Sequence, residues 1–225
     1  MKKTLLTVLC LLLFLSSCGK KQPSGDNGLS VQNDPQIIES TEPFLYDDPS
    51  AYVASHLTDD FSITYSVQYT GSEAYSMSMT RTAAGYYLAI AGSAMLFIKN
   101  GDKYDVYVDD RNDNFTLVDY LDNYSEEEVQ TQISTFFVLM TCYSGSEQNM
   151  VKTGTNRIAG RECDSYALDY SNVGMDQSFI YSIDKATGVC LKYCFDIGSS
   201  QDNQSFSFEC QEFKVGGVSL PAYGS

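Results

Sequence analysis

The sequence predicts a mainly β domain with a few helices: a single curved antiparallel sheet of about ten or eleven strands, one inserted covering helix near residues 125–140 and a short N-terminal helix. Three observations lead to this class. Many segments alternate apolar and polar residues with a period of two, which is typical of half-buried strands. Turn-forming residues separate these segments. Helices do not alternate with the strands, so a doubly wound parallel sheet is not expected.

The amino terminus has the layout of a secretory signal. Lys2 and Lys3 form a basic start, and the residues from Leu5 to Leu15 are almost entirely apolar. A helix of this length rises only about 16 Å, whereas the hydrocarbon core of a bilayer is roughly 30 Å thick. We therefore expect no permanent transmembrane helix here, and no later segment is long and apolar enough to form one.

The apolar run ends in Leu15-Ser16-Ser17-Cys18-Gly19. This stretch resembles the lipobox of bacterial lipoproteins, in which an aliphatic residue and two small residues precede a cysteine. The resemblance implies that residues 1–17 are a signal peptide and that the Cys18 thiol carries diacylglycerol with palmitate-like acyl chains, which would anchor the protein stably to a membrane. We expect a lipoprotein of the bacterial cell envelope that faces outside the cytoplasm. The alternative is a plain secretory signal with a chance cysteine.

The charge of the chain argues against two classes of partner. Removing residues 1–17 takes away two lysines and no acidic residue, so the formal net charge falls from −15 to −17. Binding to nucleic acid, or directly to anionic lipid headgroups, requires clustered Lys and Arg. Neither partner is expected, and the high negative charge is typical of a soluble surface. We expect a monomer.

Five cysteines remain once the signal is removed and the lipobox cysteine is acylated: Cys142, Cys163, Cys190, Cys194 and Cys210. The odd number leaves at least one thiol without a partner in the chain. Cys190 and Cys194 are about 13 Å apart along a predicted strand, which is too far for a disulfide. We expect mainly free thiols. The alternative is a Cys194–Cys210 bond, although matched apolar faces would place Cys210 on the side of Tyr193. No CxxC pair or histidine partner indicates a metal site, and no cofactor is expected.

Residues 18–43 comprise the lipidated cysteine and a tether that is rich in Pro, Gly, Ser, Asn and Asp, a composition typical of flexible segments. Residues 44–225 form a single domain. Its first element is a short helix in "DPSAYVASHL", with Asp48 as N-cap and Pro49 in the first turn. His56, the single histidine of the chain, lies on this helix and has no evident catalytic partner.

The segment 61–70 shows the strand pattern most clearly. Phe61, Ile63, Tyr65, Val67 and Tyr69 alternate with hydroxyl and amide side chains, so one face is apolar. Turn signals separate the further predicted strands. These lie at 73–82, 85–91, 94–99, 103–109, 115–120, 157–169, 176–184, 189–198, 205–215 and 217–220. The segments "KNGDK" and "DKATG" indicate hairpin turns at 99–103 and 184–188.

One strong helix interrupts the strands. Ser125-Glu126-Glu127-Glu128 forms a capping box. An apolar stripe follows at helical spacing, made of Val129, Ile133, Phe136, Phe137 and Met140. A helix of about 16 residues is about 24 Å long. It can therefore cover only part of such a sheet, and curling, loops or a ligand must cover the rest.

The segments "NRIAGRECDSYALDY", "YSIDKATGVCLKYCFDI" and "FKVGGVSLPA" look like the later strands of the lipoprotein-localisation (LolA/LolB-like) superfamily. The resemblance covers roughly residues 45–223. It implies a half-barrel that helices close on its concave side, with an apolar cavity that binds acyl chains.

Two functions are compatible with these features. The first is a non-catalytic binding module that holds a lipid or another apolar ligand between the sheet and the 125–140 helix. The expected cavity wall and lid are formed by Phe61, Ile63, Tyr65 and Val67, with Phe136 and Phe137. Ordinary core packing is the alternative for each of these residues. The second function is a surface interaction protein with a filled core, whose exposed Tyr, Ser and Asn contact a protein or glycan. A cavity volume distinguishes the two.

An enzyme is not expected. The chain contains no GxSxG, HExxH or P-loop motif and no paired His/Cys arrangement. The adjacent acids Asp109 and Asp110 fall in a predicted turn, where solvation explains them.

Overall fold

The computed structural model describes residues 48–109, 114–118, 123–168, 177–197 and 204–223. All of them belong to one compact unit that begins at Ile38. The predicted signal peptide, Cys18 and the tether lie outside the described residues, and so does most of the 109–114 turn. Within the described part of the chain, no helix has the length and apolar character needed to cross a bilayer.

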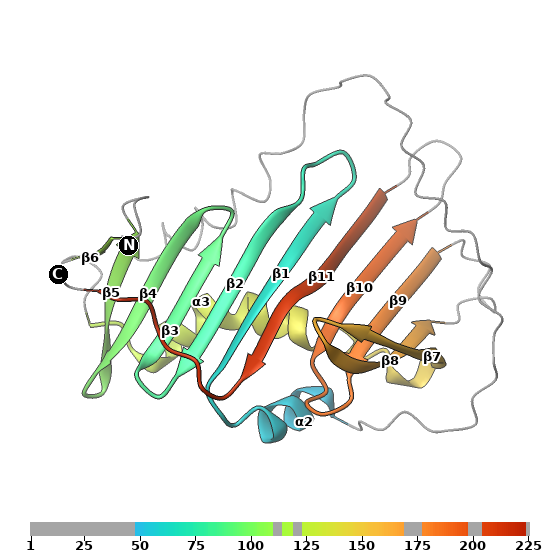
Figure 1. Cartoon of the computed structure of the whole chain (residues 1–225), viewed down its shortest axis with the longest axis horizontal. Coiled ribbons are helices and arrows are strands. Elements are labelled where there is room, and N and C mark those ends of the chain that lie inside the picture. Colours follow the sequence, from blue (N-terminus) through green and yellow to red (C-terminus); the bar gives the residue numbers. More distant parts are fainter. Residues whose placement is uncertain (1–47, 110–113, 119–122, 169–176, 198–203, 224–225) are drawn as a thin grey trace. The chain divides into compact units, whose positions relative to one another are not determined.

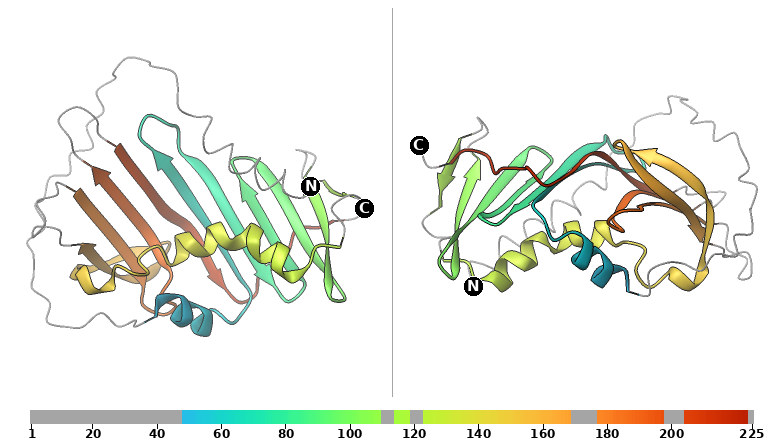
Figure 2. Two further views of the ribbon diagram at one scale, coloured as in Figure 1. Left: turned by 180° about the vertical axis from the view of Figure 1, so that it is seen from behind. Right: turned by 60° about the horizontal axis from the view of Figure 1, so that its bottom comes forward.

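The described residues contain eleven strands in one antiparallel sheet. The strands are β1 (Phe61–Tyr69), β2 (Tyr75–Thr82), β3 (Gly85–Ile90), β4 (Ser93–Asn100), β5 (Lys103–Asp109), β6 (Phe115–Leu117), β7 (Met150–Ile158), β8 (Arg161–Leu168), β9 (Gln177–Asp184), β10 (Cys190–Ile197) and β11 (Gln204–Val215). The helices are α2 (Pro49–His56) and α3 (Glu126–Met140), with a short 3₁₀ turn η2 (Glu147–Asn149). The sheet is curved, and both helices lie on its concave side (Figure 1, Figure 2). The predicted fold class is confirmed.

The strand order is β6-β5-β4-β3-β2-β1-β11-β10-β9-β8-β7. The chain therefore builds one meander from β1 outward to β6 and then starts again at the opposite edge with β7. The second meander returns to the centre, where β11 pairs with β1. Helix α3 belongs to the connection between the two edges, which explains why it runs across the sheet instead of beside it (Figure 2).

Both helices begin where the sequence predicts. The Asp48 side chain accepts a hydrogen bond from Ala51 N at 2.9 Å, and Pro49 occupies the first turn of α2. Ser125 and Glu128 form the complete capping box of α3. The stripe of α3 is fully buried at Val129, Ile133, Phe136 and Met140. Phe137 is only half-buried, because it follows Phe136 directly and so points about 100° away around the helix.

Strands β1–β6 and β9–β11 coincide with predicted strands to within a few residues. The predicted strand at 157–169 contains β8 but begins too early, because the chain reverses at Ala159-Gly160 and forms a hairpin with β7, a strand that the sequence did not predict. Both turn residues have positive φ, 48° and 78°, as the primed hairpin turns require. Alanine rarely adopts this conformation, so the usual Asn-Gly or Asp-Gly signal is missing here.

The predicted strand at 217–220 is also absent from the described sheet. Gly216 and Gly217 have φ values of 75° and 66°, which end β11. The chain then crosses the convex side of the sheet toward β5 (Figure 2). There Leu220 packs against a second apolar cluster, and the Tyr223 ring lies 5.1 Å from the ring of Tyr107. That cluster consists of Ala94, Leu96, Ile98 and Phe115.

The five described cysteines are free thiols. Cys210 pairs in register with Tyr65, whereas Cys194 pairs with Ser207, so the two cysteines lie on opposite faces. The alternative Cys194–Cys210 disulfide is therefore not formed. Burial is the main cause that raises the pKa of Cys163 and of Cys210 to about 12, so both thiols stay protonated and poorly reactive near neutral pH.

Candidate functional site

We call the face of the sheet that carries α2 and α3 the helix-side face. On this face Arg81 donates a hydrogen bond to Leu57 O just after α2, and Tyr104 donates one to Glu126 of α3. Phe61 pairs in register with Arg81, so it shares the face. By alternation along β1, Ile63, Tyr65, Val67 and Tyr69 share it too.

The predicted wall lies on this face and is tightly packed. Phe61, Ile63 and Tyr65 are 0% exposed and Val67 is 1% exposed. The Tyr65 hydroxyl donates to Cys190 O at 2.8 Å, and its ring meets Phe208 edge-on at 5.0 Å. In the described structure these side chains form core and line no open space.

The predicted lid residues behave differently from each other. Phe136 is 0% exposed and belongs to the same core, while the half-buried Phe137 lies at its margin. The structure thus brings four wall residues and Phe136 together, and it leaves Phe137 outside.

A half-exposed set of rings continues the wall. Tyr69 pairs in register with Phe206, Phe206 with Phe195, and Phe195 with Phe179. We call these four residues the outer aromatic row. It crosses β1, β11, β10 and β9 on the helix-side face, at the ends of these strands that lie farthest from α2 (Figure 1). Sequence reasoning missed this row, since it depends on the register of strands far apart in the chain.

The outer aromatic row consists of two pairs of neighbouring rings. The Tyr69 and Phe206 rings are 4.7 Å apart, and the Phe179 and Phe195 rings are 4.8 Å apart. Tyr69 is 42% exposed, and the three phenylalanines are half-buried. Such rings offer a large apolar area that remains open to a ligand.

Behind the outer row lies a more deeply placed inner row. It consists of Val67, Phe208, Tyr193 and Tyr181, which also pair in register. Tyr193 links the rows, since its ring is 5.9 Å from Phe206 and 5.7 Å from Phe208. A ligand on the outer row would therefore rest on a rigid aromatic base.

The opposite face has no comparable surface at this level of the strands. Gln68, Ser207, Cys194 and Ile180 are the matching row, one residue out of phase with the rings. The contrast shows that aromatic side chains are confined to the helix-side face in this region. Ile180, which is 40% exposed, is a natural control position.

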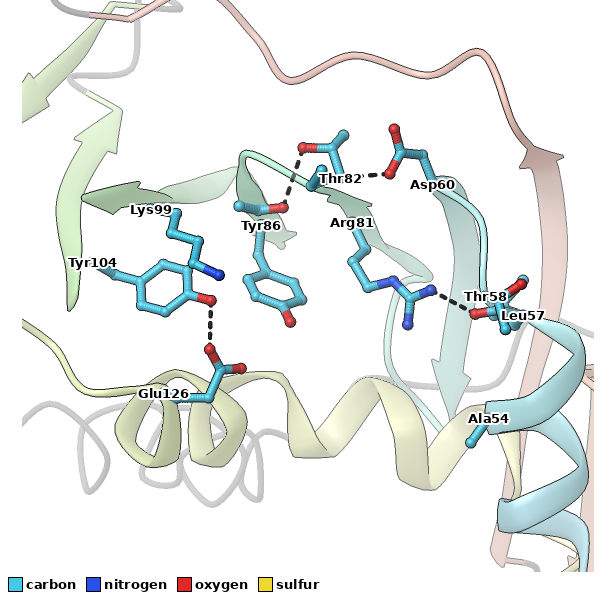
Figure 3. Close-up of a pocket in the computed structure, with 12 residues that line it drawn as sticks. Ala54, Leu57, Thr58, Asp60, Arg81, Thr82, Tyr86, Lys99, Tyr104 and Glu126 are labelled. Atoms are coloured by element: carbon cyan, nitrogen blue, oxygen red, sulfur yellow. Dashed lines mark hydrogen bonds between the residues drawn. The ribbon is translucent and has the colours of Figure 1, made fainter. Parts of the chain in front are cut away.

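A cavity of about 500 Å³ opens at the other end of the helix-side face. We call it the rim cavity. Side chains from α2, β2, β3, β4, β5 and the start of α3 surround it (Figure 3). Its lining is Ala54, Leu57, Thr58, Asp60, Arg81, Thr82, Ala83, Gly85, Tyr86, Lys99, Tyr104 and Glu126. A Cβ at position 85 would lie 1.9 Å from Phe97 O and collide with it. Only glycine can therefore occupy this position in the cavity wall.

On one side of the rim cavity, the Glu126 carboxylate already has hydrogen-bond partners within the protein. Glu126 accepts hydrogen bonds from the Tyr104 hydroxyl at 2.5 Å and from Gln130 Nε2 at 2.7 Å. The Tyr104 hydrogen bond is the main cause that lowers the pKa of Glu126. Burial and then this same carboxylate raise the pKa of Tyr104. Glu126 is thus ionised and Tyr104 protonated at neutral pH.

His56 lies at the exposed end of α2, and its contacts are local. Its ring stacks on Tyr52 at 3.8 Å, and its Nδ1 lies 2.9 Å from both Ser55 Oγ and Tyr52 O. These contacts give it a packing role. Among the described residues, no three His, Cys, Asp or Glu side chains come together as a metal site.

No protein-family model and no curated protein matches the sequence. Solved structures give distant likenesses. MucB of Pseudomonas aeruginosa, in complex with MucA, has a TM-score of 0.37 and 14% identity over 76% of this chain and 58% of that chain. An uncharacterized conserved protein from Thermus thermophilus has a TM-score of 0.36 and 12% identity, over 76% and 87% of the two chains.

A LolA superfamily protein from Nitrosomonas europaea has a TM-score of 0.26 and 10% identity, over 76% of this chain and 94% of that chain. The solved structures thus include a member of the superfamily that the sequence resembles. This chain spans 58% of MucB, the first of these structures. Likenesses at this level carry no argument about function, which has to come from the site itself.

Proposed function

We propose that the protein is an extracytoplasmic lipoprotein, anchored through Cys18, which binds a lipid or another apolar molecule on the helix-side face of its sheet. The outer aromatic row is the observation that carries this proposal. Its rings remain partly open to water, whereas the matching row on the opposite face carries no aromatic side chain. An apolar ligand would cover them and gain about 25 cal/mol for each Å² removed from water.

The predicted wall and lid residues form the deeper part of the same surface. Phe61, Ile63, Tyr65 and Val67 are sealed in the core. A ligand could reach them only if α3, with Phe136 and Phe137, moved aside. In this proposal the ligand first contacts the outer aromatic row. It contacts the wall residues only if it displaces α3. The protein is a non-catalytic monomer in this proposal.

The packed wall also favours a second candidate function. A filled core is what a surface interaction protein requires, and Tyr and Phe are common in such contact surfaces. In that case the outer aromatic row would contact a protein or glycan. The two candidates differ in one respect: only the first gives binding of a small apolar molecule in the absence of any partner.

We expect the double variant Phe195→Ser/Phe206→Ser to bind the fluorescent apolar probe N-phenyl-1-naphthylamine at least about tenfold more weakly than the parent, because each lost ring contact is worth about 1.5–3 kcal/mol. The parent would be residues 18–225 with Cys18→Ser, which keeps the whole compact unit that begins at Ile38. A fluorescence titration measures the dissociation constant.

The matched control is Ile180→Ser, which removes an exposed apolar side chain from the opposite face of the same strand group. Its affinity for the probe should equal that of the parent. Equal affinities in all three proteins, with unchanged melting temperatures, would contradict a ligand site on the outer aromatic row.

A further inference from the structure

Two cations, Arg81 and Lys99, line the rim cavity, and neither forms an ion pair with a described carboxylate. Among the described residues, ion pairs are made by Lys152, Arg161, Lys185, Lys192 and Lys214. Arg81 and Lys99 make none within this part of the chain, although the protein has 29 acidic residues and only 14 lysines and arginines. Among the described residues, no carboxylate therefore lies within ion-pairing distance of either cation, although the Lys99 charge acts on Glu126 from farther away and helps to lower its pKa.

Neutral groups hold the Arg81 side chain in place. Its Nη2 donates to Leu57 O at 2.5 Å and to Asp59 O at 3.1 Å, and its guanidinium carbon lies 4.9 Å from the centre of the Phe61 ring. These neutral partners fix the plane of the group and supply no negative charge. Its Nε and Nη1 donors have no acceptor among the described residues. A guanidinium in this state is suited to a carboxylate or a phosphate, which it can bind through two parallel hydrogen bonds.

Two further donors point into the same space. Figure 3 shows the Lys99 amine and the Tyr86 hydroxyl between Arg81 and Tyr104, facing α3. The Tyr86 hydroxyl accepts a hydrogen bond from Gln130 Nε2 at 3.3 Å, which leaves its own proton available for a ligand. Burial is the main cause that raises the pKa of Tyr86, so the hydroxyl keeps that proton.

The two carboxylates that line the cavity are engaged elsewhere. Glu126 is held by Tyr104 and Gln130, and Asp60 accepts a hydrogen bond from Ala83 N at 3.1 Å. Neither forms an ion pair with Arg81 or Lys99. The cavity volume of about 500 Å³ is within the usual range for small-molecule sites.

We propose that the rim cavity is a binding site for the carboxylate or phosphate group of a small molecule, held by Arg81, Lys99 and the Tyr86 hydroxyl. The site lies at the opposite end of β1 from the outer aromatic row, roughly 26 Å away along the strand. It therefore stands independently of the apolar site.

The test is a titration of the ¹⁵N-labelled chain of residues 18–225, carrying Cys18→Ser, with octyl phosphate, octanoate and inorganic phosphate. We expect the Arg81 Nε–H and Lys99 amide resonances to shift with at least one probe. Lys99→Gln should weaken binding at least tenfold, and Tyr86→Phe severalfold. Both variants leave the bonds between Arg81 and the end of α2 in place, so the fold is retained.

Lys103→Gln is the matched control. It removes the same charge from the same β4–β5 hairpin, but alternation along β5 places Lys103 on the other face from Tyr104. Binding by octyl phosphate but not by inorganic phosphate would identify an amphipathic headgroup as the source of the anion. Equal binding would identify a free anion, and either result supports the site.

The proposal is overturned if neither resonance shifts with any probe, or if Lys99→Gln and Lys103→Gln weaken binding equally. Its failure is separate from that of the proposed function, since the apolar probe reports on the outer aromatic row alone. The Phe195→Ser/Phe206→Ser variant should keep its affinity for the anionic probe that binds.

Discussion

Replacing Phe136 with alanine is expected to lower the free energy of unfolding by about 3–5 kcal/mol, the usual cost of deleting a fully buried ring. Phe136 is 0% exposed and lies in the middle of the stripe by which α3 packs on the sheet. Urea unfolding measures the loss. Val138→Ala is the control on the same helix, because Val138 is 64% exposed and should lose less than about 0.5 kcal/mol.

The result bears directly on ligand binding. A loss of several kcal/mol in the free energy of unfolding means that α3 is part of the core. A ligand could then reach the wall residues only if its binding offset a free-energy cost of that size. A loss below about 1 kcal/mol would contradict the packing described for α3 and would make the helix an easily displaced lid.

The second large effect is expected at Asp184, where Asp184→Asn should destabilise the domain by about 3–5 kcal/mol. Its carboxylate accepts two hydrogen bonds from Arg161, at 2.9 and 2.8 Å, and two from Thr187, at 3.0 and 2.6 Å. It is 1% exposed. The substitution leaves the Arg161 guanidinium, whose side chain is only 24% exposed, without its carboxylate partner, and breaking such a pair is the costly case.

Asp184 also ties the β9–β10 hairpin turn to β8, because Arg161 begins that strand. Thermal and urea unfolding should both show the loss. Asp196→Asn, an exposed position on β10, is the control and should be close to neutral. A change below about 1 kcal/mol for Asp184→Asn would show that the pair contributes little to this part of the sheet.

Local features of the fold could be predicted from the sequence. Strands such as β1 alternate strictly because one face is buried, and this alternation is visible in residues 61–69. The Ser125 capping box and the Asp48 N-cap are local as well. The Ala159-Gly160 turn was missed, because the left-handed conformation of Ala159 comes from the surrounding hairpin and not from the residue's own preference.

The pairing of β1 with β11 could not be read from the chain. It joins residues that are 137 to 154 positions apart, from Tyr69 with Phe206 to Phe61 with Val215, and nothing in either strand specifies the partner. The outer aromatic row depends on this pairing, so the sequence alone could not predict that Tyr69 and Phe206 are neighbours.

One signal for the rim cavity was present. In β2 the buried Met77 and Met79 are followed, at the next position of the same face, by Arg81. A cation in an apolar alternation indicates a polar site at the margin of a core.

In the proposed function, the helix-side face binds a lipid or another apolar molecule. Native mass spectrometry tests it most directly, on residues 18–225 with Cys18→Ser after incubation with an acyl-lipid extract, together with an organic extract of the same sample. We expect a bound acyl lipid, which is lost in the Phe195→Ser/Phe206→Ser variant and kept in Ile180→Ser. A bare protein mass in all three samples would contradict it.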